Sequence, residues 1–203
     1  MPDQTSANET NEDESTLLVE IVTEQSDWEK GAWAGVQDDI QHAAIAAFHA
    51  GIDARTDISF PDVDIEIGIR LTDDKEMTTL NAQWRNIDRP TNVLSFPSWD
   101  GNTELYNGES GILLGDVVLA RQTIEAEADG ANLPHVNHVK HLVVHGVLHL
   151  LGFDSPSSRL VSVNLVADEH HRSIRAGGLA EAPHPRGDVA VDRKEHTAAL
   201  PSA

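Results

Sequence analysis

The 203-residue sequence contains no cysteine, few aromatic residues (4%) and few basic residues, and each shortage excludes a class of protein or site. Without cysteine there is no disulfide scaffold, no thiolate zinc site and no thiol nucleophile. The apolar runs are far shorter than the roughly 18 residues that a membrane-spanning helix needs, so we expect no membrane partner. The sequence does not open with a basic and apolar leader, and we therefore expect a cytoplasmic protein.

The charge is strongly acidic and unevenly distributed. The chain has 34 acidic residues against 14 Lys and Arg, a net charge of −20, which argues against a large phosphate-binding surface. Residues 1–15 are polar, acidic and without periodicity, and predict a disordered leader. Residues 179–203 are rich in Pro, Ala and charge, and predict a flexible tail. A single folded domain of residues 16–178 remains, which is large enough for one hydrophobic core.

The hydrophobic periodicity of this domain alternates between strand and helix patterns. Period-two or continuous apolar patterns predict strands at 17–22, 63–71, 92–96 and 112–119. Helical periodicity predicts helices at 32–50, 74–83, 121–128, 134–151 and 160–176, with Gly51 and Gly152 as helix stops. The order predicts an α+β fold in which an approximately four-stranded mixed sheet packs against helices.

The histidines carry the clearest chemical signal. Five of the eleven lie within fifteen residues, at His135, His138, His141, His145 and His149. Residues four apart in a helix point the same way, so His145 and His149 can bind one metal ion through two ring nitrogens. Gly152 would end this helix and return position 155 toward the metal, which is the spacing of metzincin-type zinc sites. The alternative is a pair of ordinary surface or hydrogen-bonded core histidines.

Two positions depart from the usual zinc patterns. A zinc peptidase needs Glu directly after the first histidine as general base, and Gly146 occupies that position, which disfavours peptide hydrolysis. Position 155 is Ser, whose neutral hydroxyl is a poor zinc ligand.

Four segments in order resemble the bacterial YbeY endoribonucleases, the rRNA maturation factors. They read LTDDKEMTTLNAQWR (71–85), RPTNVLSFP (89–97), LLGDVVLA (113–120) and HLVVHGVLHLLGFD (141–154). The resemblance implies a zincin-like helix followed by a glycine turn and one Zn²⁺ per chain, with His145 and His149 as the first two ligands and the third falling on Ser155. Four explanations stay open at that position: Asp154 turns inward, His170 or His171 reaches over, the metal has been lost, or the reading frame is disturbed.

The resemblance assigns one further residue near the metal, and the residue types themselves suggest roles for four others. Arg85 matches an arginine that the family uses near its active site, and a fixed cation there can bind the scissile phosphate; its alternative is a surface ion pair. Asp116 lies in an apolar strand, where a buried carboxylate needs a partner, and it is expected either to orient a ligand histidine or to bond the backbone. His141 is expected to support the site or the helix packing. Trp84 and Phe96 are expected to be core residues or to stack on bases.

The function that follows is a metal-dependent, single-strand-specific endoribonuclease acting in rRNA maturation and ribosome quality control. The expected partners are single-stranded RNA or rRNA, the small ribosomal subunit and ribosome-assembly factors. RNA would approach five basic side chains, Arg70, Arg85, Arg89, Arg121 and Lys140. The alternatives are a catalytically weakened or non-enzymatic ribosome-associated factor that lost its third ligand, and a metal-dependent hydrolase of another substrate.

Overall fold

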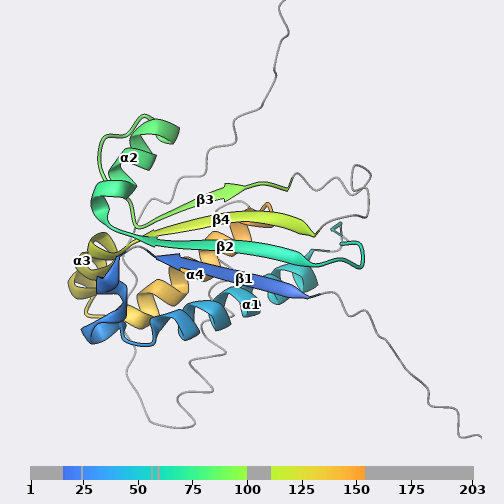
Figure 1. Cartoon of the computed structure of the whole chain (residues 1–203), viewed down its shortest axis with the longest axis horizontal. Helices are drawn as coiled ribbons and strands as arrows, with labels where there is room; N and C mark the ends of the chain where they lie inside the picture. The colour runs from blue at the N-terminus through green and yellow to red at the C-terminus, as the bar shows by residue number, and fades with distance from the viewer. Residues whose placement is uncertain (1–15, 24, 56, 59, 100–110, 154–203) are drawn as a thin grey trace, which may run out of the picture.

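One mixed sheet organises the protein. The computed structural model describes residues 16–23, 25–55, 57–58, 60–99 and 111–153. The strands are β1 (Leu17–Thr23), β2 (Ile65–Thr72), β3 (Val93–Pro97) and β4 (Ile112–Ala120), in the sheet order β1-β2-β4-β3 (Figure 1). β1, β2 and β4 run parallel, whereas β3 is antiparallel to β4. The α+β fold with a four-stranded mixed sheet is therefore confirmed.

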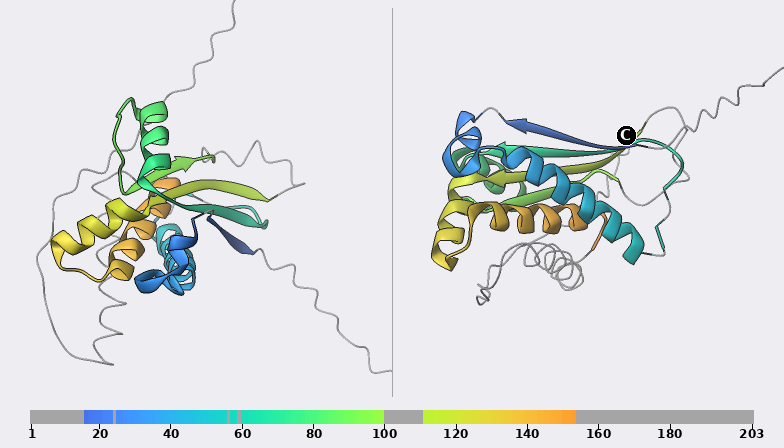
Figure 2. Two further views of the ribbon diagram at one scale, coloured as in Figure 1. Left: turned by 60° about the vertical axis from the view of Figure 1, so that its left-hand side comes forward. Right: turned by 90° about the horizontal axis from the view of Figure 1, so that it is seen from below.

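Among the described residues, four helices and two short 3₁₀ segments pack around the sheet. They are η1 (Ser26–Glu29), η2 (Gly31–Trp33), α1 (Val36–Ala54), α2 (Asp74–Arg85), α3 (Arg121–Ala131) and α4 (His135–Leu150) (Figure 2). Asp73 caps the start of α2, since its carboxylate accepts a hydrogen bond of 2.8 Å from the Glu76 amide. In the part of the chain that the structure describes, no helix is long and apolar enough to span a membrane.

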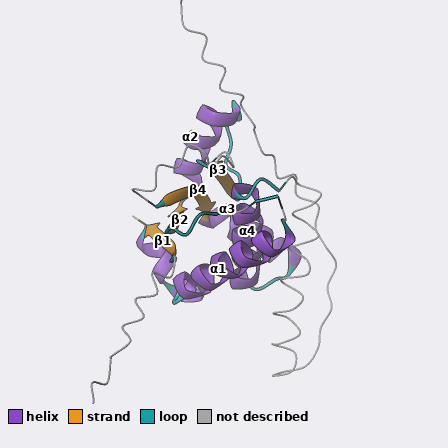
Figure 3. Cartoon of the chain, turned by 90° about the vertical axis from the view of Figure 1, so that its right-hand side faces the viewer, coloured by secondary structure: helices purple, strands orange, loops and turns teal. Residues whose placement is uncertain are grey.

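The two faces of the sheet carry different helices. Ile69 of β2 and Val117 of β4 belong to the large core that α1 and α4 complete. On the other face, Val118 of β4 and Leu94 of β3 pack with Met77 of α2. Alternate residues of a strand point to opposite faces, so β4 contributes to both cores. α2 thus lies across the sheet from α1 and α4 (Figure 3).

A bulge in β4 reverses the orientation that strict alternation predicts for Asp116. Glu66 pairs with Leu113 and Ile67 pairs with Gly115, so Leu114 is an extra residue in the ladder. One extra residue moves every later side chain to the other face. Asp116 is exposed and lies over Gly68 on the face away from α4. The expectation that Asp116 is buried is therefore wrong, and its carboxylate points away from the helix that carries the histidines.

Gly51 does not end α1, which continues to Ala54, three residues further. Gly51 instead faces α4, where a Cβ atom would overlap the Leu151 side chain and would lie 3.1 Å from Cδ2 of Leu148. The glycine permits a close approach of the two helices rather than a turn. This contact brings the end of α1 against the end of α4.

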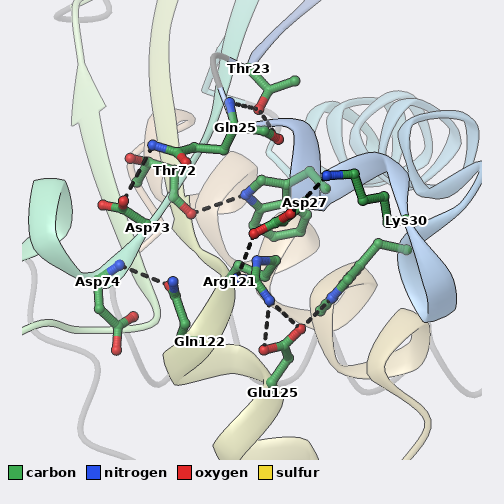
Figure 4. Close-up of polar contacts among 12 residues, drawn as sticks. Thr23, Gln25, Asp27, Lys30, Thr72, Asp73, Asp74, Arg121, Gln122 and Glu125 are labelled. Carbon is green, nitrogen blue, oxygen red and sulfur yellow. Dashed lines mark hydrogen bonds and ion pairs between the residues drawn. The ribbon is translucent and has the colours of Figure 1, made fainter.

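The carboxyl ends of the parallel strands are joined by polar contacts (Figure 4). The Trp28 indole donates to the Thr72 carbonyl at 3.0 Å, and the Asp74 amide donates to Gln122 Oε1 at 2.9 Å. Arg121 pairs with Glu125 at 2.7 Å. Ligands often bind at this edge of a parallel sheet, but here the polar side chains bond one another, and the candidate site lies elsewhere. The predicted leader, tail and 160–176 helix lie outside the described residues.

Candidate functional site

The second half of α4 carries the candidate site. Pro134 is the N-cap of this helix, directly before its first residue, and the apolar residues that follow face the main core. At the other end, Gly152 takes the left-handed conformation with φ of 79°. The Gly152 amide donates to the His149 carbonyl and the Phe153 amide to the Leu148 carbonyl, each at 3.0 Å. This pair of bonds is a Schellman motif, so the predicted glycine stop is confirmed.

His145 and His149 point toward each other. Their Nε2 atoms are 2.9 Å apart, the rings meet edge to face, and the two residues are only 6% and 3% exposed. The prediction that they share one face of a helix is therefore confirmed. Two imidazole nitrogens this close in a buried setting must share either a proton or a cation, because two facing lone pairs repel.

The turn after α4 fixes the orientation of His149. Its Nδ1 atom lies 2.7 Å from the Phe153 carbonyl oxygen. A carbonyl only accepts hydrogen bonds, so Nδ1 carries the proton and the Nε2 lone pair of the neutral ring points at His145. A backbone carbonyl that holds the second nitrogen is the usual support of a metal-binding histidine. The sequence motif gave no direct sign of this contact, because the acceptor is a main-chain atom.

The donor atoms fit a zinc ion in kind and in spacing. Two nitrogens bound to one tetrahedral zinc at about 2.0–2.1 Å lie about 3.3 Å apart. The observed 2.9 Å needs only a small opening of the two rings. Within the described segments no group of three His, Cys, Asp or Glu side chains comes together, and the candidate third ligands Asp154 and Ser155 lie outside those segments.

The surroundings of Gly146 leave no room for the glutamate that zinc peptidases carry directly after the first histidine. A Cβ atom at this position would lie 2.8 Å from Cγ1 of Val117 and 3.2 Å from the Ser95 hydroxyl. The Ser95 hydroxyl also donates to the Gly146 carbonyl at 3.2 Å. Position 146 therefore faces the sheet, and the space that a glutamate side chain needs is filled by β3 and β4.

The other histidines of the cluster have different surroundings. His135 stacks on Trp33 and bonds Asp129 at 2.8 Å, so it supports the start of α4. His138 bonds the Glu127 carboxylate at 2.8 Å. His141 is exposed one turn before His145, and its supporting role stays a prediction.

Glu127 of α3 connects α4 to the start of β3, a connection that the sequence did not suggest. Its carboxylate accepts hydrogen bonds from His138 and, at 2.9 Å, from the Asn92 amide. Burial would raise the pKa of Glu127, but these two hydrogen bonds and the charge of His138 outweigh burial, and the pKa lies below its ordinary value.

Arg85 lies across the sheet from α4, and its role at the phosphate stays a prediction. It is the last residue of α2 and is half-buried. Its neighbour Trp84 is 47% exposed and contacts Phe96 edge-on at 5.6 Å, so Trp84 is not the core residue that was expected. Phe96 follows Ser95 in β3, and Ser95 contacts α4. The edge strand β3 therefore lies between the end of α2 and the histidine segment of α4.

Comparisons with known proteins agree with these segments. A family model described as Endoribonuclease YbeY matches residues 34–172. A relative named Endoribonuclease YbeY from Bradyrhizobium sp. (strain BTAi1) is 42% identical over 120 residues, covering 59% of this chain and 68% of the relative. A relative of the same name from Rhodospirillum rubrum is 42% identical over 132 residues, covering 63% and 66%. One from Sphingopyxis alaskensis is 50% identical over 93 residues, covering 44% and 55%.

The chain spans between 55% and 68% of the length of these three relatives. A solution structure of a Thermotoga maritima protein aligns with a TM-score of 0.48 at 19% identity, covering 84% of this chain and 99% of that one. Since the family model matches more than half of the chain, including β2 and the four helices of the described residues, the chain belongs to the YbeY family.

Proposed function

We propose that this protein is a metal-dependent endoribonuclease that cuts single-stranded RNA in rRNA maturation and ribosome quality control. The observation that supports this most is the buried pair of Nε2 atoms, 2.9 Å apart, with His149 held by the Phe153 carbonyl. The names of the relatives point to the same reaction class. In this pair a cation could replace the proton that the two facing nitrogens otherwise share, as in a two-histidine metal site.

His145 and His149 would hold one zinc ion, and the third protein ligand would come from Asp154 or another residue that follows the Gly152 turn. Zinc in this position supplies a Lewis acid and makes a bound water more acidic. The protein contributes the rest: the Phe153 carbonyl keeps the proton of His149 on Nδ1, and the low exposure of both rings keeps bulk water from competing for their lone pairs.

Arg85 would bind the scissile phosphate as a fixed cation that stabilises the charge developing in the transition state. RNA lying along β3 would then meet Arg85 on one side of this strand and the histidines on the other. The exposed ring of Trp84 offers a surface on which a base could stack.

Three of the other basic side chains that were expected to meet RNA lie beside carboxylates. Arg70 pairs with Glu76 at 2.7 Å, Arg121 with Glu125 at 2.7 Å, and Lys140 lies 3.9 Å from Asp39. These ion pairs and the net charge of −20 leave a narrow cationic surface for RNA. We therefore propose that the small ribosomal subunit and assembly factors supply much of the affinity for rRNA.

The test is cleavage of a labelled single-stranded RNA by the purified full chain with added zinc, compared with a duplex of the same sequence. We expect the wild-type protein to cut the single strand and His149→Ala to lose cleavage by at least a hundredfold. His42→Ala, an exposed histidine on α1, is the matched control and should retain activity. Equal cleavage by His149→Ala and His42→Ala would overturn the proposal.

A further inference from the structure

Arg55 crosses from the end of α1 to the end of α4. It is the C-cap residue of α1, and its Nη1 atom donates to the Leu151 carbonyl at 2.7 Å, a contact between residues 96 apart in sequence. The same guanidinium lies 5.6 Å from the centre of the Phe153 ring. Its Nε and Nη2 atoms bond the two oxygens of Asp57 at 3.0 and 2.6 Å.

One side chain therefore contacts both ends of the turn that follows α4, residues 151–153. Leu151 is the C-cap of α4, and its carbonyl is one of the groups that a helix leaves without an internal partner. A cation at this end also interacts favourably with the helix dipole. Gly152 makes the approach possible, because a Cβ atom there would lie 3.0 Å from Nη1 of Arg55.

Phe153 links the Arg55 contact to the histidines. Its ring lies beside the Arg55 guanidinium, while its carbonyl accepts the Nδ1 proton of His149. Rotation of the Phe153 peptide would remove that acceptor, and His149 could then place its proton on Nε2, where it would block the lone pair facing His145.

We propose that Arg55 is a positioning residue of the metal site, which fixes the Leu151–Phe153 turn and thereby holds His149 as the Nδ1–H tautomer. This inference rests on the proposed function for its relevance to metal binding, but the tautomer itself is a property of the metal-free protein. Bonding to Asp57 raises the pKa of Arg55 above its ordinary value, although burial acts in the opposite direction, so the cation is present at every working pH.

The first experiment reads the tautomer directly. Long-range ¹H–¹⁵N spectra of the histidine-labelled, metal-free full chain at about pH 8 distinguish Nδ1–H from Nε2–H rings. We expect His149 to be the Nδ1–H tautomer in the wild type and to shift toward Nε2–H in Arg55→Met, which keeps an apolar side chain over Phe153 but lacks the donor. Arg55→Lys retains one donor and should restore most of the wild-type tautomer. An unchanged His149 tautomer in Arg55→Met would overturn the inference.

The second experiment measures zinc affinity by competition with a chromophoric chelator. We expect Arg55→Met to bind zinc about tenfold more weakly, at the lower end of the loss seen when a supporting partner of a metal ligand is removed. Asp57→Asn is the matched control, because it breaks the exposed ion pair while leaving the Arg55 contact with Leu151, and it should bind like the wild type. Equal zinc affinities for the wild type and Arg55→Met would contradict the proposed role of Arg55 in positioning the metal site.

The outcomes separate the two proposals. Wild-type protein that binds no zinc contradicts the metal-dependent function, whereas the tautomer spectra still decide the role of Arg55. If Arg55→Met does not fold, Arg55→Gln, a shorter neutral side chain without the guanidinium, takes its place. Equal zinc affinity and an unchanged His149 tautomer in folded Arg55→Gln would contradict the proposal. A tautomer shift without an affinity change would also contradict the proposed link to the metal.

Discussion

Substituting Gly146 by alanine tests whether the position beside His145 is closed by the sheet. The new Cβ atom would lie 2.8 and 3.1 Å from the two methyl carbons of Val117, closer than the roughly 3.5–4.0 Å of an ordinary carbon contact. Val117 is fully buried and β-branched, so its methyl groups cannot rotate away cheaply. Overpacking of this kind costs about 1–3 kcal/mol.

Helix propensity acts in the opposite direction. Alanine is favoured over glycine within a helix by about 1 kcal/mol. The net expectation is that Gly146→Ala lowers the free energy of unfolding by about 1 kcal/mol, from the overpacking cost less the propensity gain. Gly130→Ala is the matched control, because Gly130 lies in α3 and a Cβ atom added there would have nothing within 4 Å, and this variant should be more stable than the wild type.

Urea unfolding followed by circular dichroism measures both variants. Val117→Ala removes the two methyl groups. In a protein that already carries Val117→Ala, adding Gly146→Ala should be neutral or stabilising, which corresponds to a coupling energy of about 1–2 kcal/mol between the two substitutions. If Gly146→Ala stabilises the wild-type protein as much as Gly130→Ala does, the close contact with β4 is refuted. Zinc affinity of Gly146→Ala should also fall, because the displaced helix carries His145.

Three further outcomes follow from other contacts. The folded-state pKa of Glu127 lies below its ordinary 4.5. Its ionised carboxylate therefore stabilises the folded protein fully above about pH 4.5, and this stabilisation is lost as the pH falls through the lower folded-state pKa. Since Glu127 is 39% exposed, Glu127→Gln should cost about 1 kcal/mol in urea unfolding at pH 7 and progressively less toward pH 3; a constant difference would contradict this. Gly115→Ala should cost about 3 kcal/mol in the same assay, because φ is 143° and a Cβ atom would overlap the Phe96 carbonyl; a loss below 1 kcal/mol would contradict it. Ser155→His should tighten zinc binding by at least tenfold in chelator competition, because imidazole replaces a poor ligand; unchanged affinity would show that another residue already fills that position.

Local patterns in the sequence predict most of the fold. The alternation that predicts β2 and the glycine that predicts the end of α4 each depend on neighbours within a few residues, and both predictions are confirmed. The facing pair of His145 and His149 follows from helical spacing in the same way.

The errors arise where distant parts of the chain decide the outcome. The β4 bulge turns Asp116 outward, and it is formed against β2 rather than within the β4 sequence. Gly51 is a residue type that often ends a helix, but here it packs against Leu151, 100 residues later in the sequence. This packing, rather than the local preference of glycine, decides its role. No sequence motif indicates the contact of Arg55, because its partner is a main-chain carbonyl at the end of α4.

The central claim is that His145 and His149 bind one metal ion together, and zinc stoichiometry tests it most directly. Equilibrium dialysis of the full chain against micromolar zinc, followed by elemental analysis, should give about one zinc per wild-type chain under the usual affinity of such sites. His145→Ala and His149→Ala should each lose that zinc, whereas His42→Ala should keep it. Equal zinc content in all four proteins would contradict the account.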